Sequence, residues 1–204
     1  MKATLYYIAD PMCSWCWAFA NVFGPVEQRL RPEVSVRLVL GGLAPDDDAP
    51  MDDASRSYIR SAWRTIEERT GTRFNHSFWE ACTPRRSTWP ACRAVLAAGE
   101  RGREMFAAIQ RAYYEEARDP SERATLVALG VELGFDDGSF AEAIDAPETR
   151  RQLAEDFALR DRFGVSGFPS LALERGEERG LLTSGWLDAP ALEELLVGLD
   201  LLVR

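Results

Sequence analysis

The sequence predicts an α/β fold that carries a large all-helical insertion. Strand-like apolar runs lie only near the two ends of the chain, and the long segment between them shows helical spacing of its apolar residues. A helix-like segment follows the first run, so the chain opens as strand, helix, strand. At 204 residues the chain is long enough for one sizeable core, or for one domain that carries an insertion.

The N-terminal elements have the clearest patterns. Residues 3–9, rich in Tyr, Leu and Ile, predict a strand, and residues 34–40 predict a second strand that ends at Gly41-Gly42. Apolar residues recur at helical spacing over residues 14–30, with a kink or a break expected at Gly24-Pro25. Because no hairpin signal separates the two strands, we expect a βαβ unit with a parallel strand pair.

The middle of the chain, from about residue 54 to residue 146, is expected to contain helices and no strand. Asp119 is expected to cap one of these helices, with Pro120 at its first position and Glu122 three residues after the cap. A further helix is predicted to begin at Pro147 and to end before Gly164.

The C-terminal part returns to β structure. Residues 170–174 and 180–184 predict a hairpin, and Asp188 is expected to cap a last amphipathic helix. We therefore divide the chain into two predicted units: residues 1–44 with 147–204, and a helical insertion over residues 45–146.

Cys13 and Cys16, separated by Ser14 and Trp15, stand at the junction of the first strand and the first helix. A helix N-terminus offers free backbone N–H groups and a partial positive charge, which stabilise a thiolate. The thiolate is the species that exchanges disulfides, so we predict Cys13 as the nucleophile and Cys16 as the resolving thiol. Asp10 is expected to cap this helix, with proton transfer as the alternative role.

This order of elements resembles the thioredoxin fold with a helical insertion. More narrowly it resembles the DsbA-like thiol–disulfide oxidoreductases, in their cytosolic branch of predicted protein disulfide isomerases. Three stretches carry the resemblance: residues 10–17 (DPMCSWCW), residues 164–170 (GVSGFPS) and, more weakly, residues 89–94 (WPACRA). The architecture covers nearly the whole chain, and the first two motifs are specific when they occur together.

The resemblance implies roles for residues around the dithiol. Pro169 would be a cis-proline that faces the two cysteines, and the Phe168 backbone would pair with an extended substrate segment beside Cys13. Phe168 departs from the small β-branched residue often found at that position. Met12 and Trp15 flank the nucleophile on the side expected to be exposed, where they could form an apolar docking patch for unfolded polypeptide.

Composition limits the partners and the compartment. The net charge is −9 and no basic cluster is interleaved with aromatics, so we expect no nucleic-acid partner. The first apolar run is too short for a signal peptide, and no stretch reaches the length of a membrane span. We therefore expect a cytoplasmic protein without a membrane partner, where a Cys-x-x-Cys pair is catalytic or metal-binding more often than a structural bridge.

The other two cysteines allow several interpretations. Cys82 and Cys92 could form a second dithiol, relay electrons to Cys16, or be structural, and the structural role is favoured because free cysteine is usually buried. A zinc site made of the four cysteines, or one that uses the lone His76, lacks the second tight ligand pair typical of zinc motifs. We expect neither a metal nor a cofactor.

The leading functional hypothesis is a thiol–disulfide oxidoreductase or isomerase with a redox-active Cys13–Cys16 disulfide. It would exchange disulfides with protein or small-molecule substrates, and a thiol reductant such as glutathione or thioredoxin would reset it. One alternative is an enzyme similar to kappa-class glutathione transferases and chromene-carboxylate isomerases, which carry a serine in place of the first cysteine and lack the resolving thiol. The other is a non-enzymatic, partner-binding protein similar to protease adaptors.

Overall fold

The computed structural model describes residues 2–203 and shows an α/β fold built on one mixed sheet. The elements in chain order are β1 (Ala3–Ala9), α1 (Ser14–Glu27), β2 (Val34–Leu40), α2 (Asp53–Thr70), α3 (Phe78–Ala81), α4 (Trp89–Ala97), a 3₁₀ turn (Gly99–Arg101), α5 (Gly102–Tyr114), α6 (Arg123–Glu132), α7 (Asp137–Asp145), α8 (Pro147–Arg162), β3 (Ser170–Arg175), β4 (Glu178–Ser184) and α9 (Ala189–Gly198).

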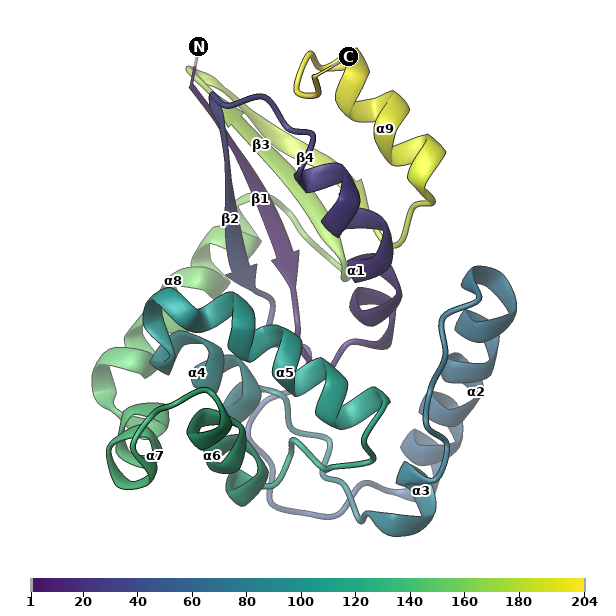
Figure 1. Ribbon diagram of the computed structural model, residues 1–204, viewed down its shortest axis with the longest axis vertical. Helices are drawn as coiled ribbons and strands as arrows, with labels where there is room; N and C mark the ends of the chain where they lie inside the picture. Colours follow the sequence, from purple (N-terminus) through teal and green to yellow (C-terminus); the bar gives the residue numbers. More distant parts are fainter. Residues whose placement is uncertain (1, 204) are drawn as a thin grey trace.

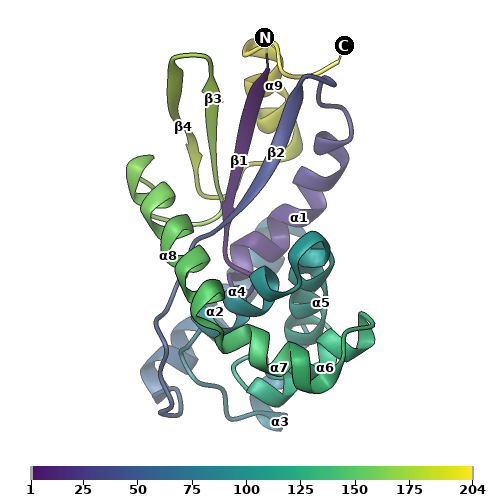
Figure 2. The same cartoon turned by 90° about the vertical axis from the view of Figure 1, so that its left-hand side faces the viewer.

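The sheet has the strand order β2-β1-β3-β4. β1 and β2 are parallel, in a register that runs from Ala3 opposite Val34 to Ala9 opposite Leu40. β3 is antiparallel to β1 and forms a hairpin with β4. Helices α1 and α9 cover one face of the sheet and α8 covers the other (Figures 1 and 2). The predicted parallel pair, hairpin and α/β class are therefore confirmed.

The alternation of side chains along β1 explains why both faces of the sheet are covered. Tyr6 and Ile8 point to one side and pack with Leu159 and Phe163 of α8 and its end. The intervening residues belong to the larger core on the α1 side, which includes Leu5, Tyr7, Ala9, Phe19 and Phe23. A strand that is buried on both faces has a nearly continuous run of apolar residues in its sequence, as β1 does.

The helices α2–α7 lie beyond the end of the sheet at which β1 and β2 finish, and the two chain termini lie at the opposite end (Figure 1). Between Gly41 and Gly164 the described residues form helices and turns, with one isolated bridge between Pro50 and Arg85. The expected helical insertion is thus present. Its boundaries at residues 45 and 146 stay a prediction.

α1 continues through Gly24-Pro25, so of the kink or break expected there the break is absent. The missing N–H of exposed Pro25 affects a turn that faces solvent, where water can bond the free carbonyl. The start of α6 also differs from the expected one. α6 begins at Arg123 and not at Pro120. The Asp119 carboxylate instead accepts hydrogen bonds from the backbone N–H and the hydroxyl of Ser121, which fixes a separate turn before the helix.

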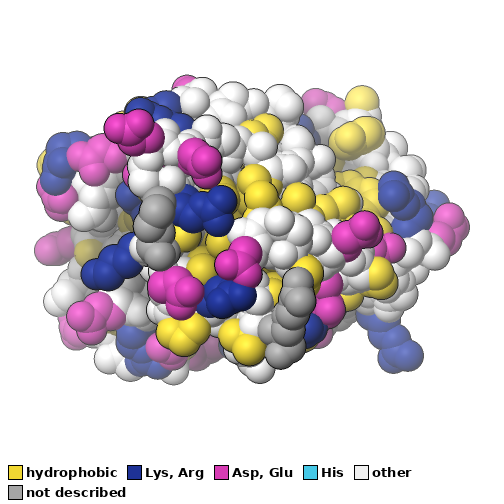
Figure 3. Space-filling view, turned by 90° about the horizontal axis from the view of Figure 1, so that it is seen from above, with side chains coloured by type: hydrophobic (Ala, Val, Ile, Leu, Met, Phe, Trp, Pro, Cys, Tyr) yellow, Lys and Arg dark blue, Asp and Glu magenta, His cyan; other side chains and the backbone are white. Residues whose placement is uncertain are grey.

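Acidic and basic side chains alternate over the end of the molecule that carries the termini, with apolar groups between them (Figure 3). Charges of both signs on one face do not make the single-sign surface that binds a phosphate backbone. None of the helices in residues 2–203 has the length and apolar character that crossing a membrane requires.

Candidate active site

The two cysteines of the Cys-x-x-Cys pair lie at the start of α1, directly after the turn that follows β1. Cys13 is the N-cap residue and is 7% exposed, whereas Cys16 lies one turn deeper and is fully buried. Both are free thiols. Both thiols are therefore buried, and Cys13 is the less buried of the two, which is the order that the sequence predicted.

The local electrostatics distinguish the two thiols. Burial raises the pKa of Cys16 well above its ordinary value, and the neighbouring Cys13 thiol adds to this effect. Burial therefore favours the protonated form of Cys16. No side chain caps the first turn of α1, at whose N-terminus Cys13 stands.

The loop between α8 and β3 faces the dithiol. Its Phe168–Pro169 peptide bond is cis, as the family resemblance predicted. The carbonyl oxygen of Phe168 lies 3.7 Å from the Sγ of Cys13, across 155 residues of sequence. Gly41, at the end of β2, makes room for the Phe168 ring, because a Cβ at this position would lie 2.2 Å from two ring carbons.

Asp10 does not cap α1, which corrects the sequence-based expectation. Its carboxylate is fully buried and accepts hydrogen bonds from the backbone N–H groups of Met12 (2.8 Å) and Leu43 (2.7 Å). It also accepts one from the Thr88 hydroxyl (2.7 Å). Asp10 precedes the N-cap residue Cys13, and its carboxylate bonds the turn before α1 instead of the first turn of the helix. Burial raises the pKa of Asp10 despite these bonds.

The third motif of the sequence, residues 89–94, brings its cysteine to this carboxylate. The Cys92 thiol is fully buried and lies 3.5 Å from an Asp10 oxygen. Burial raises the pKa of Cys92 well above its ordinary value, and the Asp10 charge adds to the rise. Cys82 is half-buried, and its thiol bonds the Ala117 carbonyl oxygen. These two contacts join residues that lie 35 and 82 positions apart in the sequence.

Met12 and Trp15 differ in exposure, and the expectation for Met12 was wrong. Met12 is 8% exposed and packs into the core, because the hydrogen bond from its backbone to Asp10 turns this residue inward. Trp15 is half-buried and its ring centroid lies 6.3 Å from that of Trp186, in the loop before α9. The Arg69 guanidinium lies over the Trp15 ring at 5.1 Å. No sequence motif marks Trp186 or Arg69 as neighbours of Trp15.

His76 and the acidic residues do not assemble a metal site. The His76 Nε2 pairs with a Glu67 oxygen at 2.9 Å, and its ring lies edge-on to Trp63. Within residues 2–203 no three side chains of His, Cys, Asp and Glu come together closely enough to hold a metal ion.

Comparison with known families gives a match over nearly the whole chain. The family model for the DSBA-like thioredoxin domain matches residues 4–197. The chain belongs to this family. The match includes β1, the Cys-x-x-Cys turn, the helical insertion and the cis-proline loop, so the resemblance stated from the sequence is confirmed.

Solved structures agree with this assignment. A candidate protein disulfide isomerase from Nitrosomonas europaea is 34% identical, with 97% of each chain covered and a TM-score of 0.85. The cytosolic disulfide reductase DsbM from Pseudomonas aeruginosa is 31% identical, again with 97% of each chain covered, and has a TM-score of 0.76. A 2-hydroxychromene-2-carboxylate isomerase shares the fold at 12% identity and a TM-score of 0.64, covering 98% and 95% of the two chains. A search of the curated proteins gave no match.

Proposed function

We propose that this protein is a thiol–disulfide oxidoreductase in which Cys13 is the nucleophile and Cys16 the resolving thiol. One observation carries the proposal: Cys13 lies at the uncapped N-terminus of α1, opposite the Phe168 carbonyl, with Cys16 buried one turn behind it. A nucleophilic thiol at the end of a helix, backed by a second and more deeply buried thiol, is the arrangement that two-step disulfide exchange requires.

The exchange proceeds in two displacements. The Cys13 thiolate attacks one sulfur of the substrate disulfide, a mixed disulfide forms, and the other substrate sulfur leaves as a thiolate. Cys16 then gives up its proton and attacks the Sγ of Cys13, which releases the second substrate sulfur. The two electrons of the dithiol have passed to the substrate, and the protein holds a Cys13–Cys16 disulfide.

The proposed direction is reduction or isomerisation of substrate disulfides in the cytoplasm. DsbM, named a cytosolic disulfide reductase, is 31% identical to this chain, and a structure of DsbM with glutathione is 29% identical. In this direction two molecules of a small thiol such as glutathione, or one thioredoxin dithiol, reduce the Cys13–Cys16 disulfide and are themselves oxidised. A reducing compartment favours this direction over the net oxidation of substrate thiols.

Substrate docking is proposed along the cis-proline loop and the neighbouring aromatic surface. The backbone at Phe168 and Pro169 would align an extended polypeptide next to Cys13, in the manner of an added strand. The half-buried rings of Trp15 and Trp186 would provide apolar contact beside it. Met12 is buried, so it supports the turn that carries Cys13 and is not part of this apolar docking surface.

Trapping of the mixed disulfide tests the proposal. A Cys16→Ala variant treated with glutathione disulfide should accumulate one glutathione per chain, on Cys13, as read by intact mass and peptide mapping. A Cys13→Ala/Cys16→Ala double variant is the matched control and should stay unmodified. An adduct on Cys82, or no adduct in the single variant, would contradict the assigned roles.

The two alternatives predict other results. A transferase-like enzyme would keep glutathione-conjugating activity in the Cys16→Ala variant, because that chemistry needs no resolving thiol. A partner-binding adaptor would keep full biological activity in the Cys13→Ala/Cys16→Ala variant. Loss of disulfide exchange in a folded double variant, together with loss of biological activity, supports the oxidoreductase.

A further inference from the structure

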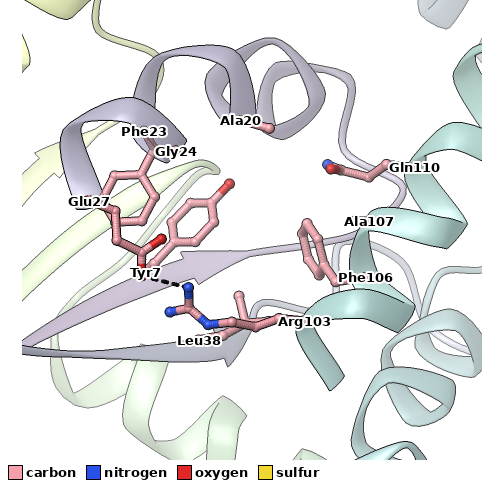
Figure 4. A pocket seen from close by; sticks show the side chains of 10 residues that line it. All are labelled: Tyr7, Ala20, Phe23, Gly24, Glu27, Leu38, Arg103, Phe106, Ala107 and Gln110. Atoms are coloured by element: carbon pink, nitrogen blue, oxygen red, sulfur yellow. Dashed lines mark hydrogen bonds and ion pairs between the residues drawn. The ribbon is translucent and has the colours of Figure 1, made fainter. Parts of the chain in front are cut away.

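A cavity of about 160 Å³ lies between α1 and α5, at the contact of the sheet with the helical insertion. β1 and β2 contribute its floor, and most of its wall is apolar. Figure 4 shows the lining side chains: Tyr7, Ala20, Phe23, Gly24, Glu27, Leu38, Arg103, Phe106, Ala107 and Gln110. The disulfide exchange proposed above makes no use of this space.

Two buried polar groups face this cavity without a strong hydrogen-bond partner. The Gln110 side-chain nitrogen has no partner within residues 2–203, although Gln110 is 2% exposed. The Tyr7 hydroxyl, on a residue that is 8% exposed, has only the weakly bonding Cys16 thiol beside it among the described residues. The two groups point toward each other beneath Ala20 (Figure 4). Leaving a buried donor unpaired costs about 1–3 kcal/mol, so an unpaired and a weakly paired group lining one cavity call for an explanation.

The mouth of the cavity is charge-balanced. An Nη1 of Arg103 on α5 lies 2.5 Å from an Oε1 of Glu27 on α1, and this ion pair closes one side (Figure 4). The two charges pair with each other, so neither is left to compensate the burial of an ionic ligand. The walls formed by Phe23, Phe106 and Leu38 suit an apolar body.

We propose that this cavity binds an uncharged, ring-sized molecule that carries one hydrogen-bond acceptor, such as a phenol or an aromatic ketone. An apolar cavity of about 150 Å³ is large enough for benzene. The ring would lie against Phe23 and Phe106, and its oxygen would accept a hydrogen bond from Gln110. The Tyr7 hydroxyl, which also neighbours the Cys16 thiol, would be the second polar contact.

Phenol and toluene are the probes that test this site, since they have nearly the same size and differ in the hydroxyl. Titrations of the full-length reduced protein by calorimetry and by amide chemical shifts should give binding of phenol, with toluene at least about fivefold weaker, the value of one ordinary hydrogen bond. Benzoate should bind more weakly than phenol, because the cavity offers no unpaired cation to compensate the burial of its charge.

Three variants locate the binding. Gln110→Leu removes the donor and keeps the size, and should weaken phenol about fivefold or more while toluene stays equal or binds more tightly. Ala107→Leu fills the space and should abolish binding of both probes. Ala128→Leu, the same change at an exposed position of α6, should leave both affinities unchanged. Circular dichroism and the Cys13–Cys16 exchange rate verify that each variant is folded.

Three results would overturn the proposal. The first is that phenol does not bind the wild-type protein, in which case water alone satisfies Tyr7 and Gln110. The second is that phenol binds equally well to Ala107→Leu, which places it elsewhere. The third is that Gln110→Leu affects phenol and toluene alike, which excludes the proposed hydrogen bond.

Discussion

The carboxylate of Asp10 accepts a hydrogen bond from the Thr88 hydroxyl at 2.7 Å, across 78 residues of sequence. Asp10 follows β1 and precedes the dithiol turn, and Thr88 is the N-cap residue of α4 in the helical insertion. The same carboxylate bonds the backbone of Met12 and of Leu43. One buried acid therefore ties the turn that carries Cys13 to the exit of β2 and to the insertion.

The hydrogen bond between Thr88 and Asp10 should contribute to the stability of the fold. Thr88→Val keeps the shape of the side chain and removes its hydroxyl, so we expect a loss of about 2 kcal/mol in the free energy of unfolding. Asp10→Ala should cost more, about 3–5 kcal/mol, because it leaves buried N–H groups unpaired. Urea unfolding measures both. Thr65→Val, at an exposed site whose hydroxyl bonds only its own helix, is the control and should stay within about 0.5 kcal/mol.

Asp10 should also give the stability a characteristic pH dependence. Its pKa is raised in the folded protein by burial, from an ordinary value of 3.8. As the pH rises above 3.8 the unfolded chain loses this proton first, so the free energy of unfolding falls, by at most about 1.4 kcal/mol per pH unit, until the folded pKa is passed. Asp10→Asn lacks this titration. The advantage of the wild type over Asp10→Asn should therefore shrink between pH 4 and pH 7, and a constant or growing advantage would contradict the assignment.

The close approach of Gly41 to Phe168 predicts a defect in exchange. Gly41→Ala places a Cβ 2.2 Å from the Phe168 ring, so the ring and its loop must shift away from their place opposite Cys13. We expect slower disulfide exchange and a loss of about 1–3 kcal/mol in stability. Gly180→Ala is the matched control, because nothing lies within 4 Å of the added carbon. Equal exchange rates in the two variants would show that the Phe168 position does not matter for the reaction.

Cys82 and Cys92 should take no part in the reaction. Cys92 is fully buried against Asp10, and burial raises the pKa of both thiols. Alkylation of the native reduced protein with iodoacetamide, followed by peptide mass mapping, should label Cys13 first and leave Cys92 protected. Cys82→Ser should keep the exchange rate within about twofold. A larger loss in that variant would instead support the electron relay that the sequence left open.

The sequence allowed correct structural predictions wherever a short contiguous motif defines the local backbone. The Cys-x-x-Cys pair and the Gly-Phe-Pro-Ser loop each define a local backbone geometry, and both lie where the sequence placed them. The βαβ start and the final hairpin could be predicted for the same reason, because their periodicity is local.

The contacts made at long range could not be predicted in this way. The partners of Asp10 come from residues 43, 88 and 92, and nothing in the spacing of a single sequence marks such a meeting. The caps assigned to Asp10 and Asp119 were wrong because an Asp side chain can also bond the backbone two residues ahead, and here it does. Met12 was expected on the surface, yet that same bond turns it into the core.

The reduction potential of the Cys13–Cys16 pair tests the central claim most directly. The protein would be equilibrated against glutathione buffers of graded composition, quenched with a thiol-trapping reagent, and read by intact mass. We predict one reversible two-electron transition at a potential between about −270 mV, the value of the reductase thioredoxin, and about −180 mV, the value of protein disulfide isomerase. A reversible transition near about −120 mV would contradict the reducing direction, and thiols that never form a disulfide across the series would contradict the oxidoreductase itself.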